Sequence, residues 1–208
     1  MVQASAAPAF ENQKPHEAPT AAQSPSWSEL LNAKTSCLIL PRMDAEVSAA
    51  AEYLATKPNV SLRIMGEKQA LLSAIHADLP APLAFFIADL LDDYEAFMNA
   101  DIMRIRLETV TSRACWKWHR DYTTLRLITT LCGDGTEYLP DPAQPDAIVR
   151  AATGDIGLFK GRLFGNHFGL EGHAACVHRS PPWTDDSCTR LLLVIDMPQD
   201  FEIEDAAR

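Results

Sequence analysis

A histidine and an aspartate two residues apart, His119 and Asp121, form the pattern whose spacing most directly suggests chemistry. In an extended segment both side chains point to the same face, because side-chain direction alternates along a strand. A third candidate ligand, His178, ends a short apolar run downstream, and His173 replaces it if a bulge shifts that strand. Two histidines and one carboxylate leave coordination positions open, which suits Fe(II) better than a closed structural zinc site.

Two arginines are candidates to hold the carboxylate of a co-substrate. Arg190 opens an apolar run after the distal histidine, and its guanidinium could grip a carboxylate through two parallel hydrogen bonds. Arg126 competes for this role, but it lies five residues beyond Asp121, so a regular strand would turn it away from the metal-facing side. The structural alternative for Arg190 is an ion pair with an acid such as Asp196 or Glu137.

The first half of the chain carries the spacing of amphipathic helices. Asp44 is typical of an N-cap, and Pro82 is typical of a first helical turn. A short apolar run at 37–40 predicts one strand before the helices. The apolar residues that follow recur at helical spacing. We therefore expect helices at 44–56, 67–78 and 83–99.

The second half has the composition and alternation of β-strands. Residues 103–110 alternate apolar and polar side chains, as a half-buried strand does. Helices followed by strands predict an α+β fold, with helices packed outside a small β-sandwich or barrel. Turns containing Gly or Pro separate the further runs that favour strands. These runs are 123–131, 147–150, 156–159, 174–178 and 190–197.

The order of H-x-D, a distal histidine and a later arginine resembles the 2-oxoglutarate and Fe(II)-dependent dioxygenases. This resemblance implies a double-stranded β-helix of the jelly-roll or cupin kind. It also implies Fe(II) held by His119, Asp121 and His178, with 2-oxoglutarate as co-substrate anchored by Arg190 or Arg126.

A closer resemblance covers roughly residues 100–197 and is to a bacterial family catalogued as domain of unknown function 1826. It implies a cupin-like metal site and supplies no activity, so the dioxygenase chemistry comes from the broader similarity. The motifs that carry it are His119-x-Asp121, Leu125-Arg126-Leu127-Ile128-Thr129-Thr130, Gly133-x-Gly135-Thr136, Lys160-Gly161 and His178-Arg179-Ser180-Pro181-Pro182.

Length and composition predict one folded unit after a disordered tail. Residues 1–25 are rich in Ala, Pro, Gln and Ser and cannot bury enough apolar surface to offset their chain entropy. We expect a single catalytic domain at 26–208, with a mainly helical part at 26–100 and a β-helix core carrying the metal site at 101–200.

Charge and cysteine content bound the partners and the compartment. The formal net charge of −10 argues against nucleic acid or an anionic membrane as partner and favours a small-molecule substrate. The five cysteines are odd in number and form no C-x-x-C, so no disulfide framework or zinc knuckle is indicated. With no export signal and no run of eighteen apolar residues, we expect a cytoplasmic protein.

The sequence thus favours an Fe(II)- and 2-oxoglutarate-dependent dioxygenase that oxidises a small molecule. One alternative is a cupin-like metal-binding protein, such as a lyase, an isomerase or a metal-homeostasis factor, that does not use 2-oxoglutarate. Another is a non-catalytic binding module, because a fold alone does not determine function.

Overall fold

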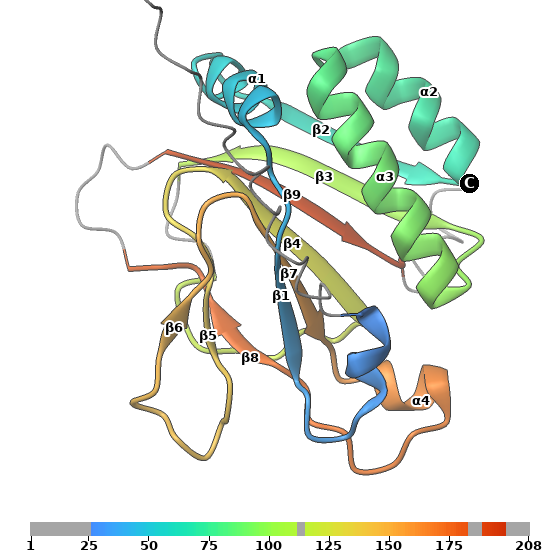
Figure 1. Ribbon diagram of the computed structural model, residues 1–208, viewed down its shortest axis with the longest axis vertical. Coiled ribbons are helices and arrows are strands. Elements are labelled where there is room, and N and C mark those ends of the chain that lie inside the picture. Colours follow the sequence, from blue (N-terminus) through green and yellow to red (C-terminus); the bar gives the residue numbers. More distant parts are fainter. Residues whose placement is uncertain (1–25, 112–114, 183–188, 199–208) are drawn as a thin grey trace, which may run out of the picture.

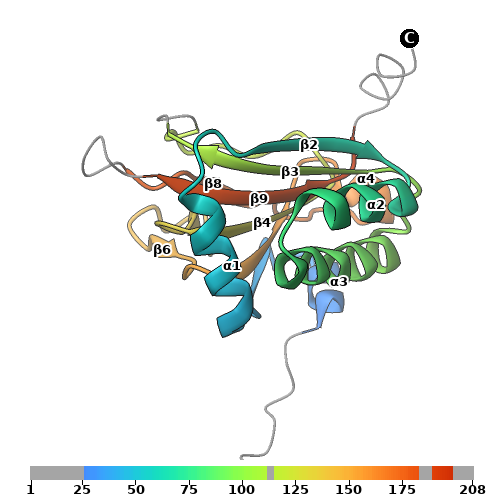
Figure 2. The same ribbon diagram turned by 90° about the horizontal axis from the view of Figure 1, so that it is seen from above.

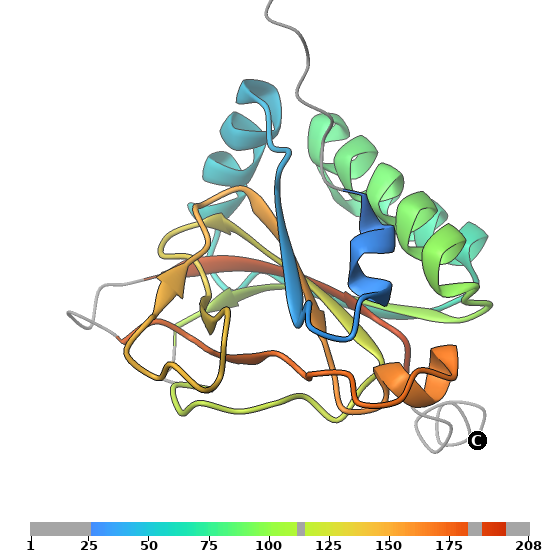
Figure 3. The same ribbon diagram turned by 60° about the horizontal axis from the view of Figure 1, so that its bottom comes forward.

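The computed structural model describes residues 26–111, 115–182 and 189–198 of the chain. The predicted disordered tail, residues 1–25, lies outside these ranges. Two sheets face each other, and three helices cover the outer face of the larger sheet (Figures 1 and 3). The view from above shows α1 on one side of this helical layer and α2 with α3 on the other (Figure 2).

The three predicted helices are present, and each ends within two residues of its expected position. They are α1 (Ala45–Ala55), α2 (Lys68–Asp78) and α3 (Ala81–Met98). The side chain of Asp44 caps α1 by accepting a hydrogen bond of 2.9 Å from the backbone N–H of Val47, which that helix would otherwise leave unpaired. The buried Tyr94 of α3 ties the helix layer to the sheet by donating its hydroxyl hydrogen to the carbonyl of Leu125, at 2.7 Å.

Six antiparallel strands form the larger sheet, in the order β1-β7-β4-β9-β3-β2. Two of them, β1 and β2, come from the part of the chain expected to be mainly helical, and they form the two edges. Strand β2 was not predicted, although Leu62 and Ile64 alternate with polar residues there. The strands are β1 (Cys37–Pro41), β2 (Ser61–Gly66), β3 (Met103–Val110), β4 (Leu125–Cys132), β7 (Asp155–Lys160) and β9 (Arg190–Asp196).

Three short strands form the smaller sheet, in the order β6-β5-β8. They are β5 (Glu137–Leu139), β6 (Val149–Arg150) and β8 (Val177–Arg179). Two further short helices, η1 (Trp27–Leu31) and α4 (Phe164–Phe168), lie beside β1 and after β7. The predicted α+β class is confirmed, and the two facing sheets form a double-stranded β-helix with the helices packed on one side.

The predicted strand at 174–178 is shorter than expected because its first residues pair elsewhere. The N–H of Cys176 donates to the carbonyl of Lys160, at the end of β7, so only 177–179 joins the smaller sheet. The run at 147–150 shortens in a similar way, because the N–H of Ala147 closes a turn onto Gln144.

Alternation along the central strands separates the main core from the space between the sheets. On β9, Leu191, Leu193 and Ile195 are fully buried in the core beneath the helices. The intervening residues Leu192 and Val194 face the smaller sheet instead. The strands that build the core therefore also present a second set of side chains to a pocket on their other face.

Candidate metal centre

The two histidines that the sequence singled out lie directly opposite each other. His119 and His178 form an isolated antiparallel bridge, in which the N–H of each donates to the carbonyl of the other at 3.1 Å. Residues paired in this way project their side chains to the same side, and the two ring centroids lie 4.6 Å apart.

Asp121 completes a cluster of three potential ligands. One ligand atom from each of His119, Asp121 and His178 lies within 4.8 Å of the others. Oδ1 of Asp121 is 3.7 Å from Nε2 of His119, and its Oδ2 is 3.2 Å from Nε2 of His178. The structure therefore brings together the three residues that the sequence analysis proposed as a facial triad.

The histidine rings are held in orientations that suit metal binding. Nδ1 of His119 lies 2.8 Å from the carbonyl oxygen of Lys117, which can only accept, so Nδ1 carries the hydrogen and Nε2 presents a lone pair to the cluster. The ring of His178 stacks on Phe159, with 5.0 Å between centroids and 22° between planes. Each imidazole thus has one neighbour that sets its orientation.

The carboxylate of Asp121 is ionised and incompletely satisfied. Burial alone would raise its pKa, but the nearby His178 and the guanidinium of Arg126 outweigh burial and hold the pKa of Asp121 at about 2. Its Oδ2 is buried and accepts no hydrogen bond within the described part of the chain, although Nε2 of His178 is close by. A divalent cation between these atoms would satisfy both, so the residues fit a metal ion.

Arg126 faces the site, and the expectation that a regular strand would turn it away is wrong. Its Nη1 lies 2.8 Å from Oδ1 of Asp121, and its Nη2 lies 2.8 Å from Oδ2 of Asp196. Side-chain direction cannot be counted over the five residues from Asp121 to Arg126, because residues 121–124 do not form a regular strand and β4 begins only at Leu125. Two carboxylates already occupy this guanidinium, which leaves it poorly placed to anchor a co-substrate.

Arg190 is buried without a carboxylate partner among the described residues. Its side chain donates to the hydroxyls of Thr130 at 2.9 Å, Ser180 at 3.3 Å and Thr136 at 3.3 Å. Only 2% of Arg190 is exposed, and burial lowers its pKa to about 10, so the group remains charged at neutral pH. A buried cation held only by neutral hydroxyls is costly, which marks a position for an anionic ligand.

The acids that could have paired with Arg190 are used elsewhere. Asp196 is fully buried between Arg104 and Arg126. Glu137 pairs with Arg150 and Arg179, each at 2.8 Å, across both neighbours of β5 in the smaller sheet. The structural interpretation of Arg190 as a member of an ion pair with either acid is therefore wrong.

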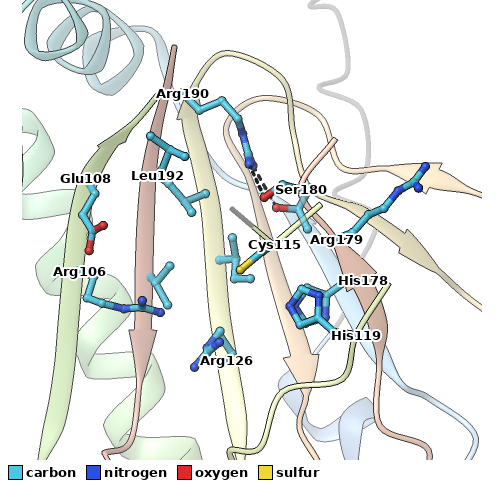
Figure 4. A pocket seen from close by; sticks show the side chains of 14 residues that line it. Arg106, Glu108, Cys115, His119, Arg126, His178, Arg179, Ser180, Arg190 and Leu192 are labelled. Carbon is cyan, nitrogen blue, oxygen red and sulfur yellow. Dashed lines mark hydrogen bonds between the residues drawn. The ribbon is translucent and has the colours of Figure 1, made fainter. Parts of the chain in front are cut away.

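A pocket of about 180 Å³ connects these groups between the two sheets (Figure 4). His119 and His178 lie at one side of it, while Arg190 reaches in from the far end beside Ser180. The wall between them is mainly aliphatic. Its lining includes Ile128, Leu192, Val194 and Val110 from the larger sheet, and Thr136, His178, Arg179 and Ser180 from the smaller sheet and its continuation.

Several residues support the candidate ligands in ways that the sequence did not indicate, although Gly161 and Arg179 belong to the family motifs. The guanidinium of Arg179 lies 4.2 Å from the ring centroid of Trp118, so the residues that follow His178 and precede His119 pack on each other. Gly161 lets the chain after β7 approach the ligand segment, because a Cβ there would lie 2.0 Å from the carbonyl oxygen of Thr123. These roles depend on contacts between distant segments, and no local pattern indicates them.

The alternative ligand His173 lies apart from the cluster. Its Nε2 accepts a hydrogen bond of 3.1 Å from the backbone N–H of Gly165, and its ring packs against Phe164 of α4. The structure therefore offers His178, and not His173, as the third member of the triad.

Comparison with solved structures supports the fold. The dioxygenase for auxin oxidation 1 from Arabidopsis thaliana, in a binary complex with 2-oxoglutarate, superposes with a TM-score of 0.52 at 10% identity, covering 83% of this chain and 88% of that chain. The rice dioxygenase for auxin oxidation gives a TM-score of 0.53 at 12% identity, covering 81% and 76%. At such identities the likeness establishes the double-stranded β-helix and no more.

Other comparisons concern the family and the membrane. No helix in the described ranges combines the length and apolar character that a membrane crossing requires. Comparison with curated proteins yields no match. The family model described as protein of unknown function (DUF1826) matches residues 26–196, which include the whole triad and Arg190. The chain belongs to this family.

Proposed function

We propose that the protein is an Fe(II)- and 2-oxoglutarate-dependent dioxygenase that oxidises a small molecule bound in the pocket. One observation carries the proposal: the pocket joins a two-histidine, one-carboxylate cluster to Arg190, a buried guanidinium with no carboxylate partner among the described residues. A three-residue ligand set leaves room for a bidentate oxoacid and dioxygen. Arg190 supplies a positive charge for the distal carboxylate of that oxoacid.

His119, Asp121 and His178 would hold Fe(II) through Nε2, a carboxylate oxygen and Nε2. When bound, the iron supplies the dioxygen chemistry, in which 2-oxoglutarate is oxidatively decarboxylated to succinate and carbon dioxide while the substrate is oxidised. Asp121 contributes a permanent negative charge, and Arg126 keeps its carboxylate oriented at 2.8 Å.

Arg190 would bind the distal carboxylate of 2-oxoglutarate. Its hydrogen-bond partner Ser180 lies two residues beyond His178, about 7 Å along an extended chain, which suits a five-carbon diacid reaching from the metal. The hydroxyls of Ser180, Thr130 and Thr136 hold the guanidinium in place and could themselves donate to the same carboxylate. The apolar side chains of Val194 and Ile128 line the pocket between Arg190 and the triad and would exclude water there.

The two alternatives make weaker use of these residues. A cupin-like metal protein of another class, such as a lyase, an isomerase or a metal-homeostasis factor, accounts for the triad but gives no reason to bury Arg190 without a counter-ion. A non-catalytic binding module accounts for the pocket but not for the unsatisfied, ionised Asp121 facing His178. The dioxygenase accounts for both features.

Titration of 2-oxoglutarate into the anaerobic Fe(II) protein tests the proposal. A chelated oxoacid produces a visible metal-to-ligand charge-transfer band, and we expect this band to saturate at one equivalent. Succinate, which lacks the 2-oxo group, is the control and should produce no band. Tight stoichiometric zinc with no oxoacid binding would replace the proposal with the metal-cupin alternative, and absence of any stoichiometric metal would leave the binding module.

A further inference from the structure

A third guanidinium, that of Arg106, enters the pocket from β3, on the side of the larger sheet away from the histidines. On β3, Ile105 and Leu107 are fully buried beneath the helices, so Arg106 between them faces the smaller sheet. Figure 4 shows its side chain on the side of the pocket opposite His119 and His178. This position differs from that of Arg190, which lies at the end of the pocket.

Arg106 has no ion pair or hydrogen bond within the described ranges, and its nearest acids are already used. Glu108, two residues along on the same face, forms an ion pair with Arg63: Nη2 of Arg63 donates to its Oε2 at 2.9 Å, and Nε of Arg63 lies 2.8 Å from its Oε1. Asp196 is held by two other arginines of the sheet. The Nε of Arg106 is buried without a partner, and burial lowers the pKa of this guanidinium.

The charges around Arg106 are mainly positive. Four guanidinium groups face this end of the sheet, against three carboxylates among the described residues. The guanidinium groups belong to Arg63, Arg104, Arg106 and Arg126, and the carboxylates to Glu108, Asp121 and Asp196. An anionic group beside Arg106 would be attracted by these guanidinium groups, and the planar fork of Arg106 matches the two oxygens of a carboxylate.

A row of apolar side chains runs between Arg106 and the metal-ligand candidates, with the paired Arg126 beside it. Arg106 lies opposite Val194 of β9, which in turn lies opposite Ile128 of β4. Beyond β4, Phe159 of β7 stacks on His178. From β3 to β4 is two strand spacings, about 10 Å. A ligand that spans this distance needs an apolar body between its anionic group and the carbon nearest the metal.

We propose that Arg106 binds the carboxylate of the substrate, and that the substrate is a small monocarboxylic acid with an apolar body, oxidised at a carbon remote from its carboxylate. This inference rests on the proposed function, because that function reserves Arg190 for the co-substrate and the triad for the metal. It adds the substrate class and the residue that selects it.

Direct binding measurements on the anaerobic Fe(II) protein test the inference. The probes are hexanoate, octanoate and phenylacetate, each compared with its neutral amide and with a phosphate monoester of similar size, with and without saturating 2-oxoglutarate. Calorimetry and ligand-observed NMR report binding without turnover. We expect at least one acid to bind at least tenfold more tightly than its amide.

Variants assign the binding to a residue. Arg106→Gln should weaken the acid by roughly thirtyfold or more while leaving 2-oxoglutarate binding unchanged. Arg106→Lys should restore part of the affinity, because it keeps the charge but not the planar fork. Arg42→Gln is the matched control. This substitution removes the same charge, but Arg42 pairs with Asp93 of the helix layer, so the variant should bind the acid as the wild type does.

Three results would overturn the inference. Acid binding that is lost in Arg190→Gln but retained in Arg106→Gln would show that the acids occupy the co-substrate anchor. Tighter binding of the phosphate monoester would show that the ligand is a phosphate and not a carboxylate. Absence of binding by every acid would show that Arg106 forms no site for a carboxylic acid. Acid binding through Arg106 in a protein that does not bind 2-oxoglutarate would instead leave the anion site standing and reject the proposed function.

Discussion

His119 and His178 are joined by two reciprocal main-chain hydrogen bonds of 3.1 Å, so the two histidines proposed as metal ligands belong to segments that cannot move independently. The side chains converge on Asp121 because the backbone already sets their direction. The candidate metal centre is therefore preformed by the fold, and removal of a proposed ligand should affect metal binding more than the fold.

His119→Ala and Asp121→Ala should each yield folded protein that has lost most of its metal, because each removes one of only three protein ligands. Metal-to-protein ratios after desalting report the loss, and circular dichroism reports the fold. His173→Ala is the control and should keep its metal, since His173 bonds to Gly165 instead. Full occupancy in both ligand variants would refute the assignment.

Gly161→Ala should weaken metal binding although Gly161 is not one of the proposed ligands. The new Cβ would lie 2.0 Å from the carbonyl oxygen of Thr123, and the adjacent Arg162 N–H bonds the carbonyl of Asp121 at 2.9 Å. We expect the free energy of unfolding to fall by about 1–3 kcal/mol, together with weaker metal binding. Gly66→Ala, whose Cβ would meet its nearest neighbour at 3.7 Å, should change neither. Equal effects of the two variants would contradict the role of Gly161.

Asp121→Asn should remove a pH-dependent part of the stability of the metal-free protein. The pKa of Asp121 is about 2 in the folded state, against an ordinary value of about 3.9 in the unfolded chain. Because the folded-state pKa is the lower one, the stabilisation is fully present above about pH 5 and is lost as the pH falls toward 2.

Urea denaturation at several pH values measures this contribution. The difference in unfolding free energy between wild type and Asp121→Asn should shrink by about 1 kcal/mol between pH 6 and pH 3. Other acids are the same in both proteins and cancel in the difference. A difference that does not change with pH would mean that the carboxylate of Asp121 titrates normally.

Arg63→Gln should weaken binding of the acid substrate although 65% of the Arg63 side chain is exposed. The substitution releases Glu108, which can then compete with the substrate for Arg106 on the same face of β3. We expect a loss of severalfold in acid affinity by calorimetry. The double variant Arg63→Gln/Glu108→Gln should recover it, and failure to recover would show that Glu108 does not compete.

The parts of the site that could be predicted from the sequence are those indicated by residues close together in the chain. The H-x-D spacing, the histidine after an apolar run and the alternation at 103–110 each depend on neighbours within a few residues. The structure brings the three candidate ligands close together and forms β3 over the alternating residues. The helices were predictable for the same reason, since capping and helical spacing are local signals.

The parts that were not predictable depend on register and on irregular backbone. The side-chain direction of Arg126 could not be counted from Asp121, because the intervening residues bond to the turn after β7: the carbonyls of Thr123 and Thr124 accept from Leu163 and Gly161. The role of Arg106 was hidden as well. The alternation along 103–110 shows only that Arg106 lies on the polar face of its strand. Whether an acidic side chain lies beside Arg106 depends on how β3 pairs with β2 and β9.

The most direct test of the account is the affinity of 2-oxoglutarate for Arg190 variants of the iron-loaded protein, measured without oxygen. Arg190→Ala should keep its metal but lose roughly thirtyfold to several thousandfold in 2-oxoglutarate affinity, because one partner of a desolvated charge pair is removed. Arg190→Lys should recover only part of this loss, since a point charge does not reproduce the planar fork. Metal content is measured on the same samples.

The unfolding free energy of metal-free Arg190→Met separates an anchoring role from a structural one. An arginine without a counter-ion among the described residues should be replaceable at a cost of no more than about 1 kcal/mol, since removal of an unpaired buried charge offsets the lost hydroxyl bonds. We predict weak 2-oxoglutarate binding by this folded, metal-containing variant against tight binding by the wild type. Absence of 2-oxoglutarate binding by the wild type at millimolar concentration would contradict the dioxygenase, and unchanged binding by the Arg190 variants would contradict its anchor.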